Sequence, residues 1–248
     1  MTLNRALSRL ALGLALLAAA WPATAEPRPS ALVLEWKRRL EAADTALRAG
    51  EWQRGRNLAR KVLAEMYDQI LDGEDVSKAL GTTLTFLAVG EAGAGEQDAA
   101  LWHWQTAQQL FPDAQRFDLA PFGAPGQWLK EQKLKTYEAP SELPRAPISE
   151  TIHVIGGEIQ APKKRSAPLP DYPEAMRQAR KELLVILSVV IDEQGKVSNP
   201  QVLKSSGAPT MVLASLEAVR RWTFRPALLN GKPVKVFYTL TVNFRLQG

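Results

Sequence analysis

The stretch that decides the fold of the C-terminal part is Pro170-Asp-Tyr-Pro-Glu-Ala-Met-Arg-Gln-Ala-Arg180, followed by the apolar run Leu183-Leu-Val-Ile-Leu-Ser-Val-Val-Ile191. Proline suits the first turn of a helix, so Pro173 predicts a short helix that ends near residue 180. The run is apolar at nearly every position, which predicts a central strand that is covered on both faces. Asp192-Glu-Gln-Gly195 then turns the chain, because glycine readily adopts positive φ.

Two further strands and a second helix follow this turn. The segment Val197–Ser205 contains Pro200, which cannot donate to a ladder and so predicts a strand at an edge or with a bulge. Val212, Leu216 and Val219 recur at helical spacing and predict a helix with one buried face. The last strand alternates, with Val236, Tyr238, Leu240, Val242, Phe244 and Leu246 on one side and Phe237, Thr239, Thr241, Asn243 and Arg245 on the other. One of its faces should pack on the core, and the other should meet water or a partner.

The N-terminal half has a helical pattern. Apolar residues recur at spacings of three and four from Leu32 to Leu71, and Gly50-Glu-Trp52 interrupts them, so we expect two antiparallel helices. A second helix pair is expected at about residues 80–90 and 97–110. The residues that carry the helical spacing in the first pair are Leu34, Leu40, Ala43, Leu47, Leu58, Val62, Met66 and Ile70.

The second helix pair has a sharper signature. Gly95, Ala100, Trp104, Ala107 and Pro112 have a spacing that resembles the tetratricopeptide repeat, in which small residues let two helices approach closely. The first pair matches this pattern more weakly. An ordinary bundle of helical hairpins is the alternative that the pattern leaves open.

Residues 1–25 predict an export signal. Arg5 and Arg9 give a positive start, residues 10–20 are an unbroken apolar run, and Ala23-Thr-Ala25 is a small-x-small cleavage site. A membrane-spanning helix needs about 20 apolar residues, which is more than this run provides. We therefore expect cleavage and a location in the periplasm. Retention as an inner-membrane anchor, with the chain facing the periplasm, is the alternative.

Proline density separates the two halves of the chain. Six prolines between residues 138 and 170 favour an extended linker, in which only Ile152–Gly157 is expected to pair as a short strand. The expected domains are therefore a tetratricopeptide-like helical domain at 26–137, a Pro-rich linker at 138–166 and a C-terminal domain at 167–248. The fold class is α+β: all-α helical hairpins, then a small antiparallel sheet with two helices.

Charge and composition exclude several classes of function. Residues 167–248 carry a net charge of +5, whereas residues 26–166 carry −2. No nucleic-acid recognition motif accompanies the basic part, so an acidic partner or a membrane surface is the favoured interpretation. The chain has no cysteine and two histidines, and His103 has no second metal ligand three or four residues away. We expect no cofactor, no metal, no small-molecule substrate and no enzyme activity.

The pieces of the C-terminal domain occur in an informative order. They are Tyr172-Pro173, the strand, Asp-x-x-Gly195, Ser-Ser-Gly207, Arg-Arg-Trp-x-Phe-x-Pro226 and the alternating strand. This order resembles the C-terminal domain of the TonB family. Proteins of that family are energy transducers, and their C-terminal domain binds the TonB box, a short peptide of outer-membrane receptors. The peptide adds as a strand beside the last strand, a mode known as β-augmentation.

The resemblance implies a set of partner-binding residues. On the last strand these are Tyr238, Thr239, Leu240, Thr241, Val242, Asn243, Phe244 and Arg245, and the segment beside the receptor supplies Leu169, Pro170, Tyr172 and Pro173. Leu169 departs from the best-studied members of the family, which carry glutamine there. For Tyr172 and Pro173, helix entry and core packing are an equally open interpretation.

Three functions therefore stay open. The first is a periplasmic, non-enzymatic protein that binds a receptor peptide and recruits a second protein with its helical domain. The second is a membrane-anchored TonB energy transducer for receptor-dependent import of iron chelates or cobalamin. The third is a structural envelope protein that forms a homodimer through its edge strand.

Overall fold

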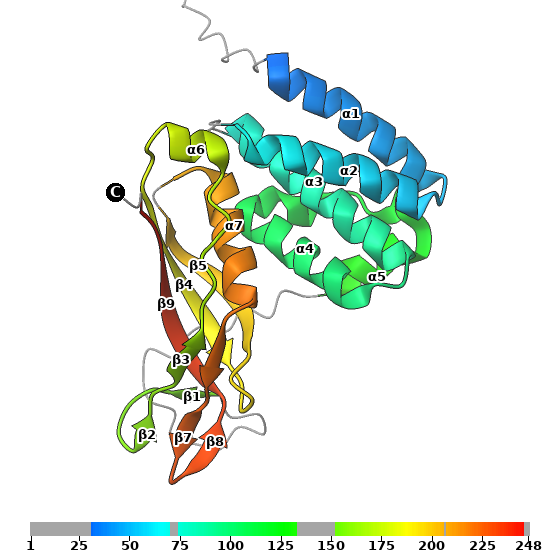
Figure 1. Ribbon diagram of the computed structural model, residues 1–248. Coiled ribbons are helices and arrows are strands. Elements are labelled where there is room, and N and C mark those ends of the chain that lie inside the picture. Colours follow the sequence, from blue (N-terminus) through cyan, green and yellow to red (C-terminus); the bar gives the residue numbers. More distant parts are fainter. Residues whose placement is uncertain (1–30, 70–73, 133–151, 206, 246–248) are drawn as a thin grey trace, which may run out of the picture.

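The structure, a computed structural model, describes residues 31–69, 74–132, 152–205 and 207–245 (Figure 1). The expected export signal, residues 138–151 of the expected linker and Leu246 lie outside these ranges. The described chain is α+β, with helices in the N-terminal part and a sheet with two helices in the C-terminal part. Within the described residues, no helix is both long and apolar enough to cross a membrane.

The N-terminal part consists of paired helices, as the sequence predicts. These are α1 (Ala31–Arg48), α2 (Trp52–Tyr67), α3 (Glu74–Gly93), α4 (Gln97–Leu110) and α5 (Gly123–Glu131), with the 3-10 turns η1 (Pro112–Arg116) and η2 (Ala120–Phe122) before α5. Helix α3 is central and contacts the other four helices. Ala100, Trp104 and Ala107, which the repeat-like spacing singled out, are all buried. The helical hairpins are confirmed, and their assignment as tetratricopeptide repeats stays a prediction.

Leu34, the first residue of the apolar spacing that indicated α1, does not lie on the buried side of this helix. Leu34 is 53% exposed, whereas Val33 and Trp36 are buried. The buried stripe of α1 continues through Leu40, Ala43 and Leu47, and residue 34 lies one position, about 100° of helix, away from it.

The C-terminal sheet has the strand order β1-β9-β4-β5. Its strands are β1 (His153–Val154), β9 (Val236–Phe244), β4 (Leu183–Ile191) and β5 (Val197–Ser205), and its helices are α6 (Glu174–Gln178) and α7 (Pro209–Arg220). Strand β4 is central and β5 is an edge, as predicted. The pairing of β5 with β4 shifts register between Ser198 and Gln201, and Asn199 has a φ of +48°, so the bulge expected at Pro200 is also present.

The prediction that β4 is covered on both faces is wrong. Helix α7 packs on one face of the sheet, where Val185, Leu187 and Val189 are buried. The other face is only partly covered, because Ile186 is half-buried and Leu184 is 41% exposed. An apolar residue at every position therefore did not mean burial at every position.

Short strands surround the start of β9. They are β2 (Ile159–Gln160), β3 (Lys163–Ser166), β6 (Thr223–Arg225), β7 (Ala227–Leu229) and β8 (Lys232–Val234), with β2 paired to β7, β7 to β8 and β3 to β6. The strand expected within Ile152–Gly157 is present as β1. Residues 159–166, expected to be spacer, instead pair with β7 and β6. Their partners lie more than 50 residues further along the chain, so local sequence does not reveal them.

The two parts share an apolar interface along α7. Leu213 of α7 belongs to the core of the helices, and Trp102 of α4 belongs to the core of the sheet. The Arg220 guanidinium lies 4.5 Å from the Trp102 ring centre. The Tyr67 hydroxyl donates a 2.9 Å hydrogen bond to Oε2 of Glu217. The helical part therefore packs on α7, which in turn packs on the sheet (Figure 1).

Glu217 makes this interface sensitive to pH. Burial raises its pKa above the ordinary value of 4.5, although the Tyr67 hydrogen bond acts in the opposite direction. Because the folded state holds the proton more tightly than the unfolded chain, stability is fully present below about pH 4.5 and falls as pH rises through the raised pKa. We expect Glu217→Gln, which can still accept from Tyr67, to remove this decline and stabilise the protein at neutral pH.

Thermal unfolding of both proteins across this pH range measures the effect. Glu193→Gln, in the exposed turn after β4, is the matched control because it removes the same charge outside the interface. Parallel pH profiles for Glu217→Gln and the unaltered chain would contradict the prediction.

Candidate functional site

The outer edge of β9 is open along most of its length. Strand β1 pairs with β9 only at Val236 and Phe237, in parallel. From Tyr238 to Phe244, no described strand pairs with β9 on the side away from β4. An unpaired strand edge presents a row of N–H and C=O groups that can accept another strand.

The contact with β1 identifies the backbone groups on this edge. The His153 N–H donates to the Lys235 carbonyl at 2.8 Å, so the backbone of residue 235 points outward. The N–H and C=O of one residue point to the same side of a strand, and the side alternates along the chain. The outward groups of the open edge therefore belong to Thr239, Thr241 and Asn243. The side chains of these three residues are exposed as well.

The opposite edge of the sheet, β5, is closed by a single side chain of the helical part. The Gln109 amide of α4 donates to the Pro200 carbonyl at 3.0 Å and accepts from the Val202 N–H at 3.2 Å. A residue of a parallel neighbouring strand makes the same pair of bonds, so the Gln109 amide takes the place of a strand residue opposite position 201. Strand addition is therefore blocked at the middle of β5.

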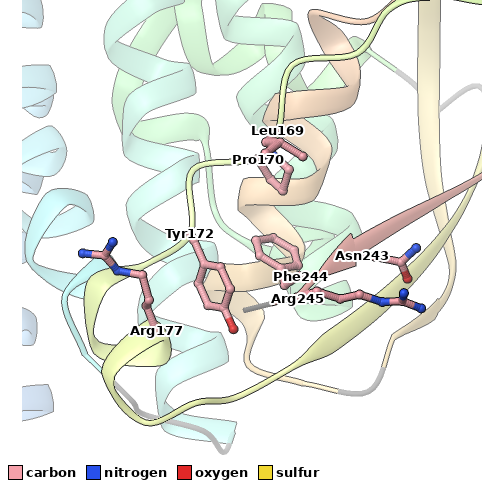
Figure 2. Close-up of a pocket in the computed structure, with 7 residues that line it drawn as sticks. All are labelled: Leu169, Pro170, Tyr172, Arg177, Asn243, Phe244 and Arg245. Carbon is pink, nitrogen blue, oxygen red and sulfur yellow. The ribbon is translucent and has the colours of Figure 1, made fainter. Parts of the chain in front are cut away.

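A pocket of about 590 Å³ lies at the end of the open edge (Figure 2). The Tyr172 ring packs edge to face on Phe244, with centres 5.2 Å apart, and the Tyr172 hydroxyl donates to the Lys181 carbonyl. The Trp222 indole N–H donates to the Pro168 carbonyl at 2.9 Å and holds the start of this segment in place. The lining residues are Leu169, Pro170, Tyr172, Arg177, Asn243, Phe244 and Arg245.

The pocket is lined by both apolar and polar side chains. Leu169 is 72% exposed, and it lies beside Pro170. Asn243 and Arg245 point to the same side in Figure 2, and Arg177 points to the other. Hydrogen bonds from Gln178 and Arg177 lower the pKa of Glu174, which keeps the Arg177 partner ionised. Such a surface can hold an apolar side chain between two cations.

Among the described residues, no three His, Cys, Asp or Glu side chains form a cluster that could hold a metal ion. His103 contacts a carboxylate of Glu91 at 2.6 Å, within the helices and far along the chain from the pocket.

The structure brings together six of the residues singled out by sequence. Three come from the segment before α6 and three from the end of β9: Leu169, Pro170, Tyr172, Asn243, Phe244 and Arg245. Pro173 lies apart from them, buried at the start of α6. The side chains of Leu240 and Val242 are in the core, and the Tyr238 ring packs 5.9 Å from Phe224. The backbone, and not these side chains, is exposed in the middle of the strand.

Sequence reasoning missed two residues of the site. Arg177 reaches the pocket from α6. Leu184 is paired with Asn243 and lines a neighbouring pocket of about 300 Å³. No local pattern singled out Arg177, because α6 carries one acidic residue, Glu174, and one basic residue. Leu184 carried no signal, because every neighbour in its strand is apolar or small.

Comparisons with known proteins concern this C-terminal part. Residues 168–246 match a family model described as Gram-negative bacterial TonB protein C-terminal. Protein TonB of Vibrio cholerae is 34% identical over 79 residues, which cover 32% of this chain and 32% of that protein. Protein TonB of Xanthomonas campestris is 35% identical over 92 residues, which cover 37% of this chain and 41% of the relative.

A solved structure, the solution NMR structure of the Pseudomonas aeruginosa TonB CTD, is 22% identical with a TM-score of 0.32, and the match covers 39% of this chain and 96% of that one. The chain thus spans only about a third to two fifths of the curated relatives that it matches. The resemblance to the TonB family that the sequence indicated is confirmed for the C-terminal domain.

Proposed function

We propose that this chain is a non-enzymatic binding protein that takes up an extended peptide of an outer-membrane receptor as an additional strand of its sheet. The observation that supports this most directly is the edge of β9, which is open from Tyr238 to Phe244 while Gln109 closes the edge of β5. The match to the TonB C-terminal family favours a peptide like the TonB box.

The geometry of the open edge favours transient binding of the peptide. Three residues, Thr239, Thr241 and Asn243, present outward backbone groups, and each hydrogen bond contributes about 0.5–1.5 kcal/mol net. Strand β1 limits the added strand at one end, and the pocket around Phe244 receives a side chain at the other. Backbone bonds would supply affinity, and the pocket would supply choice among peptides.

The helical part has a proposed role of its own, the recruitment of a second protein. A groove of about 470 Å³ lies between α1 and α3, and the apolar side chains in it include Leu40, Phe86 and Phe117. Because the helices pack firmly on α7, a protein held in this groove would keep a fixed position relative to β9.

The location and the coupling to transport belong to the proposal as well. We place the chain in the periplasm after cleavage of residues 1–25. A chain that keeps this segment as an anchor would act as an energy transducer for receptor-dependent import. Mass spectrometry of the mature N-terminus separates the two, since only the cleaved chain begins at Glu26.

Titration of the isotope-labelled full chain with synthetic TonB-box peptides tests peptide binding. We expect chemical-shift changes at the amides of Thr239, Thr241 and Asn243, together with Leu169 in the pocket, and few at β5. The same peptide with an internal proline is the control, because it cannot complete the ladder. If the amides of β9 do not respond at millimolar peptide, the proposed function is wrong. Self-association through β9 would instead make the same shifts depend on protein concentration.

A further inference from the structure

The end of the sheet domain where β9 begins is densely basic. Seven cations lie there on the short strands and turns. This end of β9 is opposite the one that lies near α6 (Figure 1). We call them the basic tip: Lys163, Lys164, Arg165, Lys196, Arg225, Lys232 and Lys235. Three carboxylates, Glu158, Asp192 and Glu193, lie on the same strands and turns, which leaves a net charge of +4.

Strand register places several of these cations on one face. Lys163 of β3 is directly opposite Arg225 of β6, and Lys196 is bridged to Thr223, two residues before Arg225. Residues two apart on a strand share a face, so Lys163, Lys196 and Arg225 project to the same side. Like charges directly opposite one another destabilise a sheet. The fold therefore tolerates a repulsion that a single uncharged residue would remove.

Neighbouring side chains do not neutralise the basic tip. Among the described residues, none of its seven cations forms an ion pair. Lys164 lies over the Trp222 ring instead, 4.4 Å from its centre. Asp192 uses one carboxylate oxygen to accept the N–H groups of Gln194 and Lys196. The charge is left available to an external anion.

We infer that the basic tip binds the surface of a membrane that is rich in anionic phospholipid headgroups. The cations are distributed over β3, β6, β8 and the turn after β4, and they do not converge on a single point. Many mobile phosphate groups on a broad surface can match such a distribution, whereas one acidic peptide would have to follow a bent path across three small sheets. Each Lys or Arg near an anionic leaflet strengthens binding roughly fivefold.

This docking would orient the protein. Strand β9 runs from the basic tip toward the pocket at Phe244, so the pocket would lie away from the lipid surface (Figure 1). The open edge would stay accessible while the tip is bound. The inference is independent of the proposed function, because none of the seven basic-tip residues belongs to the Tyr238–Phe244 edge.

Vesicle co-sedimentation of the full chain tests the inference. We expect binding to equimolar phosphatidylcholine and phosphatidylglycerol, weakened by salt, and none to phosphatidylcholine alone. The triple variant Lys163→Gln, Lys196→Gln and Arg225→Gln should bind on the order of 100-fold more weakly. The control variant Lys61→Gln, Lys78→Gln and Lys130→Gln removes the same charge from exposed positions of the helical part and should bind like the unaltered chain.

Two outcomes would overturn the inference. One is equal binding of both triple variants to anionic vesicles, since the tip would then have no special role. The other is tighter binding to soluble polyglutamate than to anionic vesicles, which would identify an acidic protein as the partner. Thermal unfolding shows whether the tip variant is folded, and its peptide titration at β9 should be unchanged.

Discussion

Replacement of Thr241 by proline should weaken binding of a strand-forming peptide on the order of 100-fold while the domain still folds. Thr241 lies at the centre of the open edge, and its N–H points away from β4 by the alternation that starts at the His153–Lys235 bond. Proline removes this donor, and its ring occupies the space where the added strand must lie. The neighbouring bonds at Thr239 and Asn243 are therefore lost too, which together amounts to about 3 kcal/mol.

The fold should tolerate this change because proline is accepted in an edge strand when the missing N–H faced solvent. Thr241→Val is the matched control, since it keeps the N–H and alters only an exposed side chain. Peptide titration followed by calorimetry gives the affinity, and circular dichroism monitors the fold. If proline and valine at this position gave equal affinities, peptide recognition would not use the edge of β9.

The open edge of β9 shows which features of the sheet the sequence could predict and which it could not. Strict alternation from Val236 to Phe244 predicted the strand and its buried face, because burial on one side imposes a period of two. Pro200 predicted an edge or a bulge, and β5 has both. Neither pattern could show which edge was open. That depends on Gln109, about 90 residues before its partners, whose side-chain amide has no sequence signature of strand capping.

The sequence predicted the candidate site only through the resemblance of its motifs to those of a known family. The segment from Leu169 to Tyr172 was associated with the last strand by resemblance, and the structure brings both into one pocket. Arg177 and Leu184 were missed because their places depend on where α6 folds back and on which face of β4 is uncovered. Local sequence patterns indicate the secondary structure that a residue favours. Whether that residue lies on a binding surface depends on which residues tertiary packing leaves uncovered.

Gly195→Ala should destabilise the C-terminal domain by more than about 4 kcal/mol, an exceptionally large effect for the addition of one methyl group. The sequence predicted a positive φ at Gly195, and the value is +78°. It did not predict that a Cβ there would lie 1.8 Å from the carbonyl oxygen of Phe224. The Phe224 N–H also donates to the Gly195 carbonyl at 2.8 Å, so the turn cannot retreat without losing this bond.

Gly231→Ala separates the two causes of this destabilisation, which are the positive φ and the steric contact with the Phe224 carbonyl. Gly231 has the same φ of +78°, and a Cβ there would meet nothing within 4 Å. Its substitution should cost only the backbone strain of about 1–2 kcal/mol for a left-handed residue. Thermal unfolding of the two variants measures the difference, which isolates the steric contact with β6. Equal destabilisation by both would mean that the turn relaxes, so that the contact between Gly195 and Phe224 does not hold β6 against the β4–β5 hairpin.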